Sequence, residues 1–143
     1  MLAWRLCRAP FAELSGEGGR LYGGRWNRRG RPVVYLASSA ALAVLEVRVH
    51  LDLPLELLPD DYVLLTVDLS DLSTERVNTV PADTAEFGDA WLREQRTAVL
   101  QVPSLIVPES PNLLLNPAHP DAGRATVVGH RPFAFDQRLW LPR

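Results

Sequence analysis

The stretch Val-Val-Tyr-Leu-Ala (residues 33–37) is followed, after two serines, by Ala-Ala-Leu-Ala-Val-Leu-Glu-Val-Arg-Val-His (residues 40–50). The first segment is short, apolar and rich in β-branched residues, which predicts a buried strand. Ser38 or Ser39 can cap a helix that continues to about residue 50. Because this helix is apolar on nearly every side, we expect it to be buried in the domain.

Further elements are expected on both sides of this strand and helix. Residues 9–31 contain six glycines and are expected to be mostly loop. The other segments that we expect are strands at 2–8, 62–69, 124–128 and 132–135, apolar segments at 99–102 and 105–107, a helix at 83–96 and a short helical turn at 111–116. Strands dominate the second half, so the pattern predicts an α+β fold and not a regularly alternating α/β fold.

Composition limits the class of protein. The chain has 143 residues, of which 47% are hydrophobic, so a single domain spanning residues 1–143 can bury a core. No apolar run approaches the ~18 residues that a membrane span needs, and the N-terminus does not resemble a signal peptide. We therefore expect a cytoplasmic protein that does not bind a membrane. The net charge of −2 does not indicate direct nucleic-acid binding.

The basic residues are all arginine, and their distribution is uneven. The chain has no lysine, which excludes Schiff-base chemistry and a Walker-type phosphate loop. Five arginines fall within residues 20–31, and six acidic residues follow within residues 52–71. The basic loop is either a solvated surface or a positive site for an anionic ligand or partner, and the sequence leaves both interpretations open.

Glu46 is the only acid in the apolar helix. Leu42, Leu45 and Val49 lie at i−4, i−1 and i+3, so the carboxylate points into or beside an apolar face. Burying a lone carboxylate is costly, and His50 is the only partner available within the helix. Glu46 is therefore either a structural residue that pairs with an arginine from elsewhere or a catalytic carboxylate facing a developing oxocarbenium ion.

Arg25 and Tyr35 are the candidate ligand-binding residues beside it. Gly23 and Gly24 allow the backbone to turn tightly next to a ligand, and an arginine binds phosphate through two parallel hydrogen bonds. This loop lacks the third glycine of a Rossmann fingerprint. Tyr35 can stack on a planar ring or donate a hydrogen bond at a pocket edge. A surface loop arginine and a core tyrosine are the alternative interpretations.

The remaining polar residues show no established catalytic or metal-binding pattern. Ser104 lacks the G-x-S-x-G elbow of a serine hydrolase, so we expect it to make a polar contact to a ligand or to the backbone. The three histidines lack metal-ligand spacing, and we expect no metal site. Asn112 and Asn116 are expected to stabilise turns, with a place in a pocket wall as the alternative. Cys7 is the only cysteine and is expected to pack in the core.

Five motifs together resemble the RES domain family, toxins of bacterial toxin–antitoxin pairs that are named for an Arg, a Glu and a Ser. The motifs are Gly-Gly-Arg-Trp-Asn (23–27), Pro-Val-Val-Tyr-Leu-Ala-Ser (32–38), Ala-Leu-Ala-Val-Leu-Glu-Val (41–47), Val-Pro-Ser (102–104) and Leu-Leu-Asn-Pro-Ala-His-Pro (114–120). The resemblance extends from Trp4 to Leu139, and several motifs match in order, so it is more specific than any single motif.

The resemblance implies a fold, an activity and a partner. The fold is a compact α+β domain with β-sheets around a cleft, similar to ADP-ribosyltransferases such as diphtheria toxin. The activity is cleavage of the nicotinamide–ribose bond of NAD, by hydrolysis or phosphorolysis, with NAD as the substrate and without a metal. The partner is an antitoxin with an Xre-like DNA-binding region that covers the active site. A homodimer and a hetero-oligomer with the antitoxin both remain open.

The family's Arg, Tyr and Glu fall on Arg25, Tyr35 and Glu46, which the resemblance implies to be catalytic. Arg25 would hold the diphosphate of NAD, and Tyr35 would pack against the nicotinamide or its ribose. Glu46 would stabilise the oxocarbenium-like ribose as nicotinamide leaves.

The family's Ser falls on Ser104, which would hydrogen-bond the ligand or brace the catalytic glutamate. We expect Trp26 and Asn116 to complete the dinucleotide site. Two other functions stay open: ADP-ribosylation of a specific protein, and a non-catalytic module whose basic loop docks an antitoxin.

Overall fold

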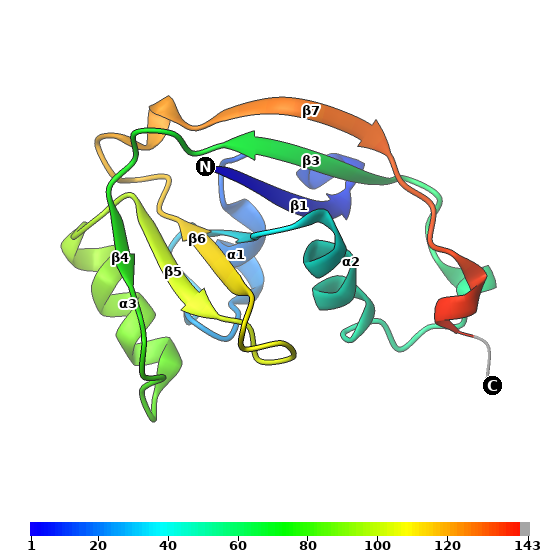
Figure 1. Ribbon diagram of the computed structural model, residues 1–143, viewed down its shortest axis with the longest axis horizontal. Helices are drawn as coiled ribbons and strands as arrows, with labels where there is room; N and C mark the ends of the chain where they lie inside the picture. The colour runs from blue at the N-terminus through cyan, green and yellow to red at the C-terminus, as the bar shows by residue number, and fades with distance from the viewer. Residues whose placement is uncertain (141–143) are drawn as a thin grey trace.

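The computed structural model describes residues 1–140, and a single seven-stranded sheet organises this range (Figure 1). The sheet order is β4-β5-β6-β2-β1-β3-β7, and its strands are antiparallel except for the parallel pair β4 and β5. The strands are β1 (Leu2–Arg8), β2 (Val34–Ala37), β3 (Tyr62–Asp68), β4 (Thr74–Arg76), β5 (Val99–Pro103), β6 (Pro111–Leu115) and β7 (Thr126–Pro132). The expected α+β class is confirmed.

Three α-helices and several short 3₁₀ turns complete the described range. The helices are α1 (Glu17–Tyr22), α2 (Ala40–Arg48) and α3 (Thr84–Glu94), and the 3₁₀ turns are Ala9–Phe11, Leu55–Leu57, Ala122–Arg124 and Gln137–Leu139. Ser39 caps α2 by accepting a hydrogen bond from the Leu42 backbone N–H at 3.0 Å, as the sequence predicted. Asp83 caps α3 in the same way.

The sheet opens between its two halves. β1 pairs with β3 along its whole length, from Leu2↔Asp68 to Arg8↔Tyr62, whereas its register with β2 is the pair Trp4↔Ala37. Figure 1 shows β1, β3 and β7 running together, while β5 and β6 turn away at an angle. Because β1 and β2 diverge beyond this pair, a cleft forms between the halves, and α2 lies against β1 and β2 beside it.

Each half has an apolar cluster that fixes a helix in place. α3 packs through Trp91 and Leu92 against Leu100 and Leu114 of β5 and β6. α2 packs its Leu42 and Ala43 into a cluster that includes strand residues from β1 and β3. Full burial of a leucine side chain contributes ~1.5–3 kcal/mol to folding, so these clusters hold the helices firmly on the sheet.

Three local predictions were wrong. Residues 111–116 contain the strand β6 instead of a helical turn, because Leu113, Leu114 and Leu115 lie in the middle of the sheet and are all 0–1% exposed. Residues 9–31, by contrast, are mostly loop as expected, although they include α1 and the 3₁₀ turn Ala9–Phe11. Residues 132–135 do not form a strand of their own, since β7 is continuous to Pro132. α2 is not buried all round: of its residues only Leu42 and Ala43 are buried, because another face, with Glu46 and Val47, borders the cleft.

Candidate active site

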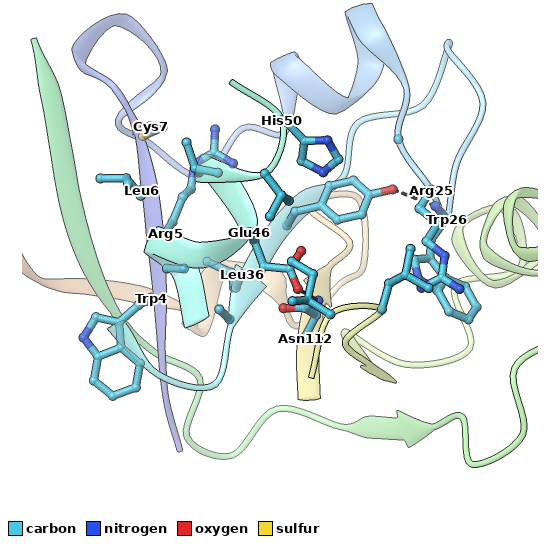
Figure 2. Close-up of a pocket in the computed structure, with 18 of the residues that line it drawn as sticks. Trp4, Arg5, Leu6, Cys7, Arg25, Trp26, Leu36, Glu46, His50 and Asn112 are labelled. Carbon is cyan, nitrogen blue, oxygen red and sulfur yellow. Dashed lines mark hydrogen bonds between the residues drawn. The ribbon is translucent and has the colours of Figure 1, made fainter. Parts of the chain in front are cut away.

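A cavity of about 560 Å³ lies in the cleft between the halves of the sheet. Its wall combines β1, the loop that precedes β2, β2 itself, α2 and the ends of β5 and β6. The predicted residues Arg25, Trp26, Tyr35 and Glu46 all line this one cavity. Figure 2 shows Glu46 at the centre of the view, with Arg25 and Trp26 to one side and Arg5 to the other.

Glu46 is held by two donors from distant segments. Its Oε1 accepts a hydrogen bond from Ser104 Oγ at 2.7 Å and another from Asn112 Nδ2 at 2.8 Å. Glu46 and Asn112 are both labelled in Figure 2. Among the described residues Oε2 accepts no hydrogen bond, so one carboxylate oxygen is fixed and the other is left for a ligand. His50 lines the cavity but makes no hydrogen bond to Glu46. The partners of Glu46 therefore come from distant segments and not from its own helix.

Ser104 lies behind the cavity wall and connects Glu46 to the loop between β5 and β6. It is only 2% exposed and lies in the turn between β5 and β6. While its hydroxyl donates to Glu46, its Oγ accepts from the backbone N–H groups of Ile106 and Val107, both at 3.1 Å. Of the two roles expected for Ser104, the structure therefore supports bracing the glutamate.

Arg25 sits at the tip of a tight loop. The bridge Gly24↔Asn27 closes the loop, with the Gly24 N–H donating to the Asn27 carbonyl at 3.0 Å. A Cβ at Gly24 would lie 2.6 Å from the Tyr35 hydroxyl, so a side chain there would push the loop away from β2. The Arg25 guanidinium lies 5.8 Å from the ring centre of Trp26. The loop thus presents a guanidinium to the cavity from a closely packed backbone.

Tyr35 joins this loop to the sheet. Its hydroxyl accepts from the Trp26 backbone N–H at 3.0 Å and donates to Asn27 Oδ1 at 2.6 Å. Burial raises the pKa of Tyr35 above its ordinary value, so the phenol stays protonated. Because the hydroxyl already has both partners, the ring is the part of Tyr35 available to a ligand in the cavity.

The basic loop is partly neutralised within the chain. The Arg28 guanidinium lies within 3.0–3.4 Å of carboxylates of Asp83, Glu86 and Asp89, and Arg20 pairs with Glu17. Two of the five arginines therefore bond carboxylates of their own chain, whereas Arg25 faces the cavity.

Asn116 stabilises a turn, as expected from the residues, but it does not line the cavity in which we expected it to help bind the dinucleotide. It is 1% exposed, donates to the Leu92 carbonyl at 3.1 Å and accepts from the Ala118 N–H, and it is absent from the cavity wall. The asparagine in the wall is Asn112, whose side chain points from β6 toward the cleft. Alternation alone does not separate the two asparagines, because positions four apart in a strand share a face; the register of β6, which ends at Leu115, distinguishes Asn112 from Asn116.

Neither a metal cluster nor a membrane span emerges from the part of the chain that the structure describes. No group of three or more His, Cys, Asp or Glu side chains gathers there in a metal-binding arrangement. Between residues 1 and 140, no helix combines the length and the apolar character that crossing a bilayer requires.

Comparison with known families agrees with this geometry. The RES domain matches residues 2–136, which is nearly the whole chain. The chain belongs to the RES domain family. Of the three residues that the resemblance matched to the family's Arg, Glu and Ser, Arg25 and Glu46 line the cavity, and Ser104 lies behind its wall and hydrogen-bonds Glu46.

Individual relatives and one solved structure extend the comparison. The Prs ADP-ribosylating toxin of Sphingobium sp. (strain YBL2) is 44% identical over 89% of this chain and 86% of its own length. Toxin Res of Photorhabdus laumondii subsp. laumondii is 39% identical over 97% of both chains. A chain of the M. tuberculosis MbcT–MbcA toxin–antitoxin complex shares the fold, with a TM-score of 0.74 and 22% identity over 93% of this chain and 84% of that chain.

Proposed function

We propose that this RES-domain protein is the toxin of a toxin–antitoxin pair and that it cleaves the nicotinamide–ribose bond of NAD. The observation that carries the proposal is the convergence of Arg25, Tyr35 and Glu46 on one cavity from a loop, a strand and a helix. The names of the relatives, which include a toxin that ADP-ribosylates Prs, support an enzyme that acts on NAD.

In the proposed reaction, Arg25 binds the diphosphate through its guanidinium. The Tyr35 ring packs against the nicotinamide or its ribose. The bond between the anomeric carbon and the nicotinamide nitrogen breaks, and its electron pair leaves with nicotinamide, which becomes neutral. The positive charge develops on the ribose, where the free Oε2 of Glu46 stabilises it. Water or phosphate then bonds to the anomeric carbon, and the proton that it loses passes to solvent.

The experiment compares two isosteric variants. Glu46→Gln keeps the size of the side chain and removes its charge, so kcat for NAD should fall by ~100-fold or more. Glu56→Gln is the matched control, because Glu56 is exposed on a 3₁₀ turn outside the cavity. Release of nicotinamide is followed by NMR with and without phosphate, which also identifies the acceptor. Equal kcat in both variants would refute the mechanism.

Arg25 has its own control in the same loop. Arg25→Ala should weaken NAD binding, whereas Arg29→Ala should not, because Arg29 is exposed and outside the cavity wall. Calorimetry with NAD on each variant measures the difference. Wild-type affinity in Arg25→Ala would remove its assigned role.

Protein ADP-ribosylation is the second candidate, and the 44% identity to the Prs ADP-ribosylating toxin favours it. The same cleavage step applies, with a nucleophilic side chain of a target protein as the acceptor. Incubation of the enzyme with labelled NAD and a cell lysate separates the two functions. Label in a discrete protein band supports transfer, whereas free ADP-ribose supports hydrolysis.

The proposed partner is an Xre-like antitoxin that covers the cleft. The support is the likeness in fold to a chain of a solved toxin–antitoxin complex. Leu105 and Ile106, which line the cavity and are 69% and 37% exposed, offer an apolar rim to such a partner. We place the protein in the cytoplasm, where NAD is available. Addition of the product of a neighbouring antitoxin gene should abolish NAD turnover, and undiminished turnover would contradict this partner.

A further inference from the structure

We propose that the N-terminal turns of α3 position Arg25 for the dinucleotide, with Thr84 and Gly88 as the positioning residues. The inference rests on the proposed function of the cavity. α3 contributes no residue to the cavity wall, and its sequence lies some sixty residues beyond the loop that it would control. The evidence is a set of contacts that fix the backbone on both sides of residue 25.

Thr84 fixes the backbone of Arg25 itself. Its Oγ1 donates a hydrogen bond to the Arg25 carbonyl at 2.6 Å, across 59 residues of sequence. Thr84 is the first residue of α3, directly after the cap Asp83, so its position is set by the start of a well-packed helix. The hydrogen bond therefore fixes the position of Arg25, which lies outside regular secondary structure, relative to α3.

Gly88 allows the next residue of the loop to touch the helix. A Cβ added at Gly88 would lie 1.7 Å from the Trp26 carbonyl oxygen, a separation that atoms cannot adopt. Trp26 also contacts the neighbouring Phe87 edge-on, with ring centres 6.1 Å apart. A glycine inside a helix destabilises it relative to alanine. Its presence here is explained by the backbone of the Arg25 loop, which packs where a side chain would be.

Arg28 attaches the C-terminal end of the loop to α3. Its backbone N–H donates to Asp89 Oδ1 at 3.1 Å, and its guanidinium also reaches Asp89 Oδ2 at 3.4 Å. The loop is thus bonded to α3 at residue 25, packed against it at residue 26 and bonded again at residue 28.

These contacts matter because no described residue accepts a hydrogen bond from the Arg25 side chain, and the side chain's contact is with the Trp26 ring. The direction of the guanidinium is therefore set by the loop backbone. Recognition of a diphosphate by two parallel hydrogen bonds requires that direction to be correct, and a displacement of ~1 Å is costly. We infer that loosening the attachment to α3 weakens NAD binding and leaves the chemistry at Glu46 largely intact.

The test uses Thr84→Val, which keeps the shape of threonine and removes its hydroxyl. We expect the KM for NAD to rise about threefold to tenfold, as for loss of one hydrogen bond, with kcat within about twofold of wild type. Thr84→Ser should restore the wild-type KM, because it keeps the hydroxyl. Thr79→Val is the control, since Thr79 is exposed in the loop before α3.

Binding of NAD to the same variants in the inactive Glu46→Gln background, measured by calorimetry, gives an affinity that does not depend on turnover. If the protein with Thr84 intact neither binds nor cleaves NAD, the proposed function fails, and the inference fails with it. If that protein binds NAD and Thr84→Val binds it equally well, the positioning role alone is overturned. A fall in kcat without a change in affinity would also overturn it. Gly88→Ala, if it folds, should raise KM by at least as much as Thr84→Val.

Discussion

Asn112→Ala tests whether the orientation of Glu46 contributes to catalysis. The change removes the Nδ2 donor that lies 2.8 Å from Oε1 and leaves Ser104 as the other partner of that oxygen. A hydrogen bond to a charged group contributes ~1.5–3 kcal/mol, and because Glu46 is half-buried we take the lower part of that range. If the hydrogen bond stabilises the transition state by ~1.5–2 kcal/mol more than the ground state, its loss lowers kcat roughly 10-fold to 30-fold.

The effect should be confined to kcat, because Asn112 has no assigned contact with the diphosphate. Initial rates of nicotinamide release over a range of NAD concentrations separate kcat from KM. Asn78→Ala is the matched control, since Asn78 is exposed on a loop outside the cavity wall. The reasoning is refuted if Asn112→Ala keeps the kcat of the control while Glu46→Gln is inactive.

The other predictions concern stability and the Arg25 loop. Ser104→Ala removes a hydroxyl that makes three hydrogen bonds. The free energy of unfolding should fall by ~2–3 kcal/mol, and the midpoint of thermal unfolding should fall by ~5–12 °C. An unchanged midpoint would contradict the role of Ser104 in holding Glu46 and the loop. Tyr35→Phe frees Trp26 N–H and Asn27 Oδ1 and should raise KM for NAD severalfold, unlike Tyr22→Phe at an exposed position. Because burial raises the pKa of Tyr35 above the ordinary value of 10, the stability that this shift provides is complete below pH 10 and declines above it. Urea unfolding at about pH 8 and about pH 11 should therefore show the wild type losing more stability than Tyr35→Phe, and parallel losses would refute the assignment.

Local patterns in the sequence predicted the elements that carry the site. The strand at β2, the cap of α2 at Ser39 and the strand β3 follow from apolar periodicity and capping, which depend on neighbouring residues. β6 was missed because a central strand covered on both faces has no alternation, and its apolar run also suits a short helical turn.

The sequence predicted most of the residues of the candidate site, but it did not predict which residues they contact. Arg25, Tyr35 and Glu46 were candidates from their local sequence, the motifs shared with the RES domain family supported them, and all three line the cavity. Tyr35 was expected to serve the ligand, yet its hydroxyl is occupied by the loop that carries Arg25. Asn116 was selected because it lies in the motif at 114–120, which does not include Asn112, and only the tertiary structure shows that Asn112 is the asparagine beside Glu46.

The amino-acid sequence by itself determined the family, the α+β class and the identity of the charged residues, because each of these is recorded in short segments of neighbouring residues. The tertiary structure decided which oxygen of Glu46 is held, by donors 58 and 66 residues away. It also decided that α3 supports the Arg25 loop. Contacts of this kind form only when the sheet brings remote segments together, and their geometry depends on packing that no local pattern specifies.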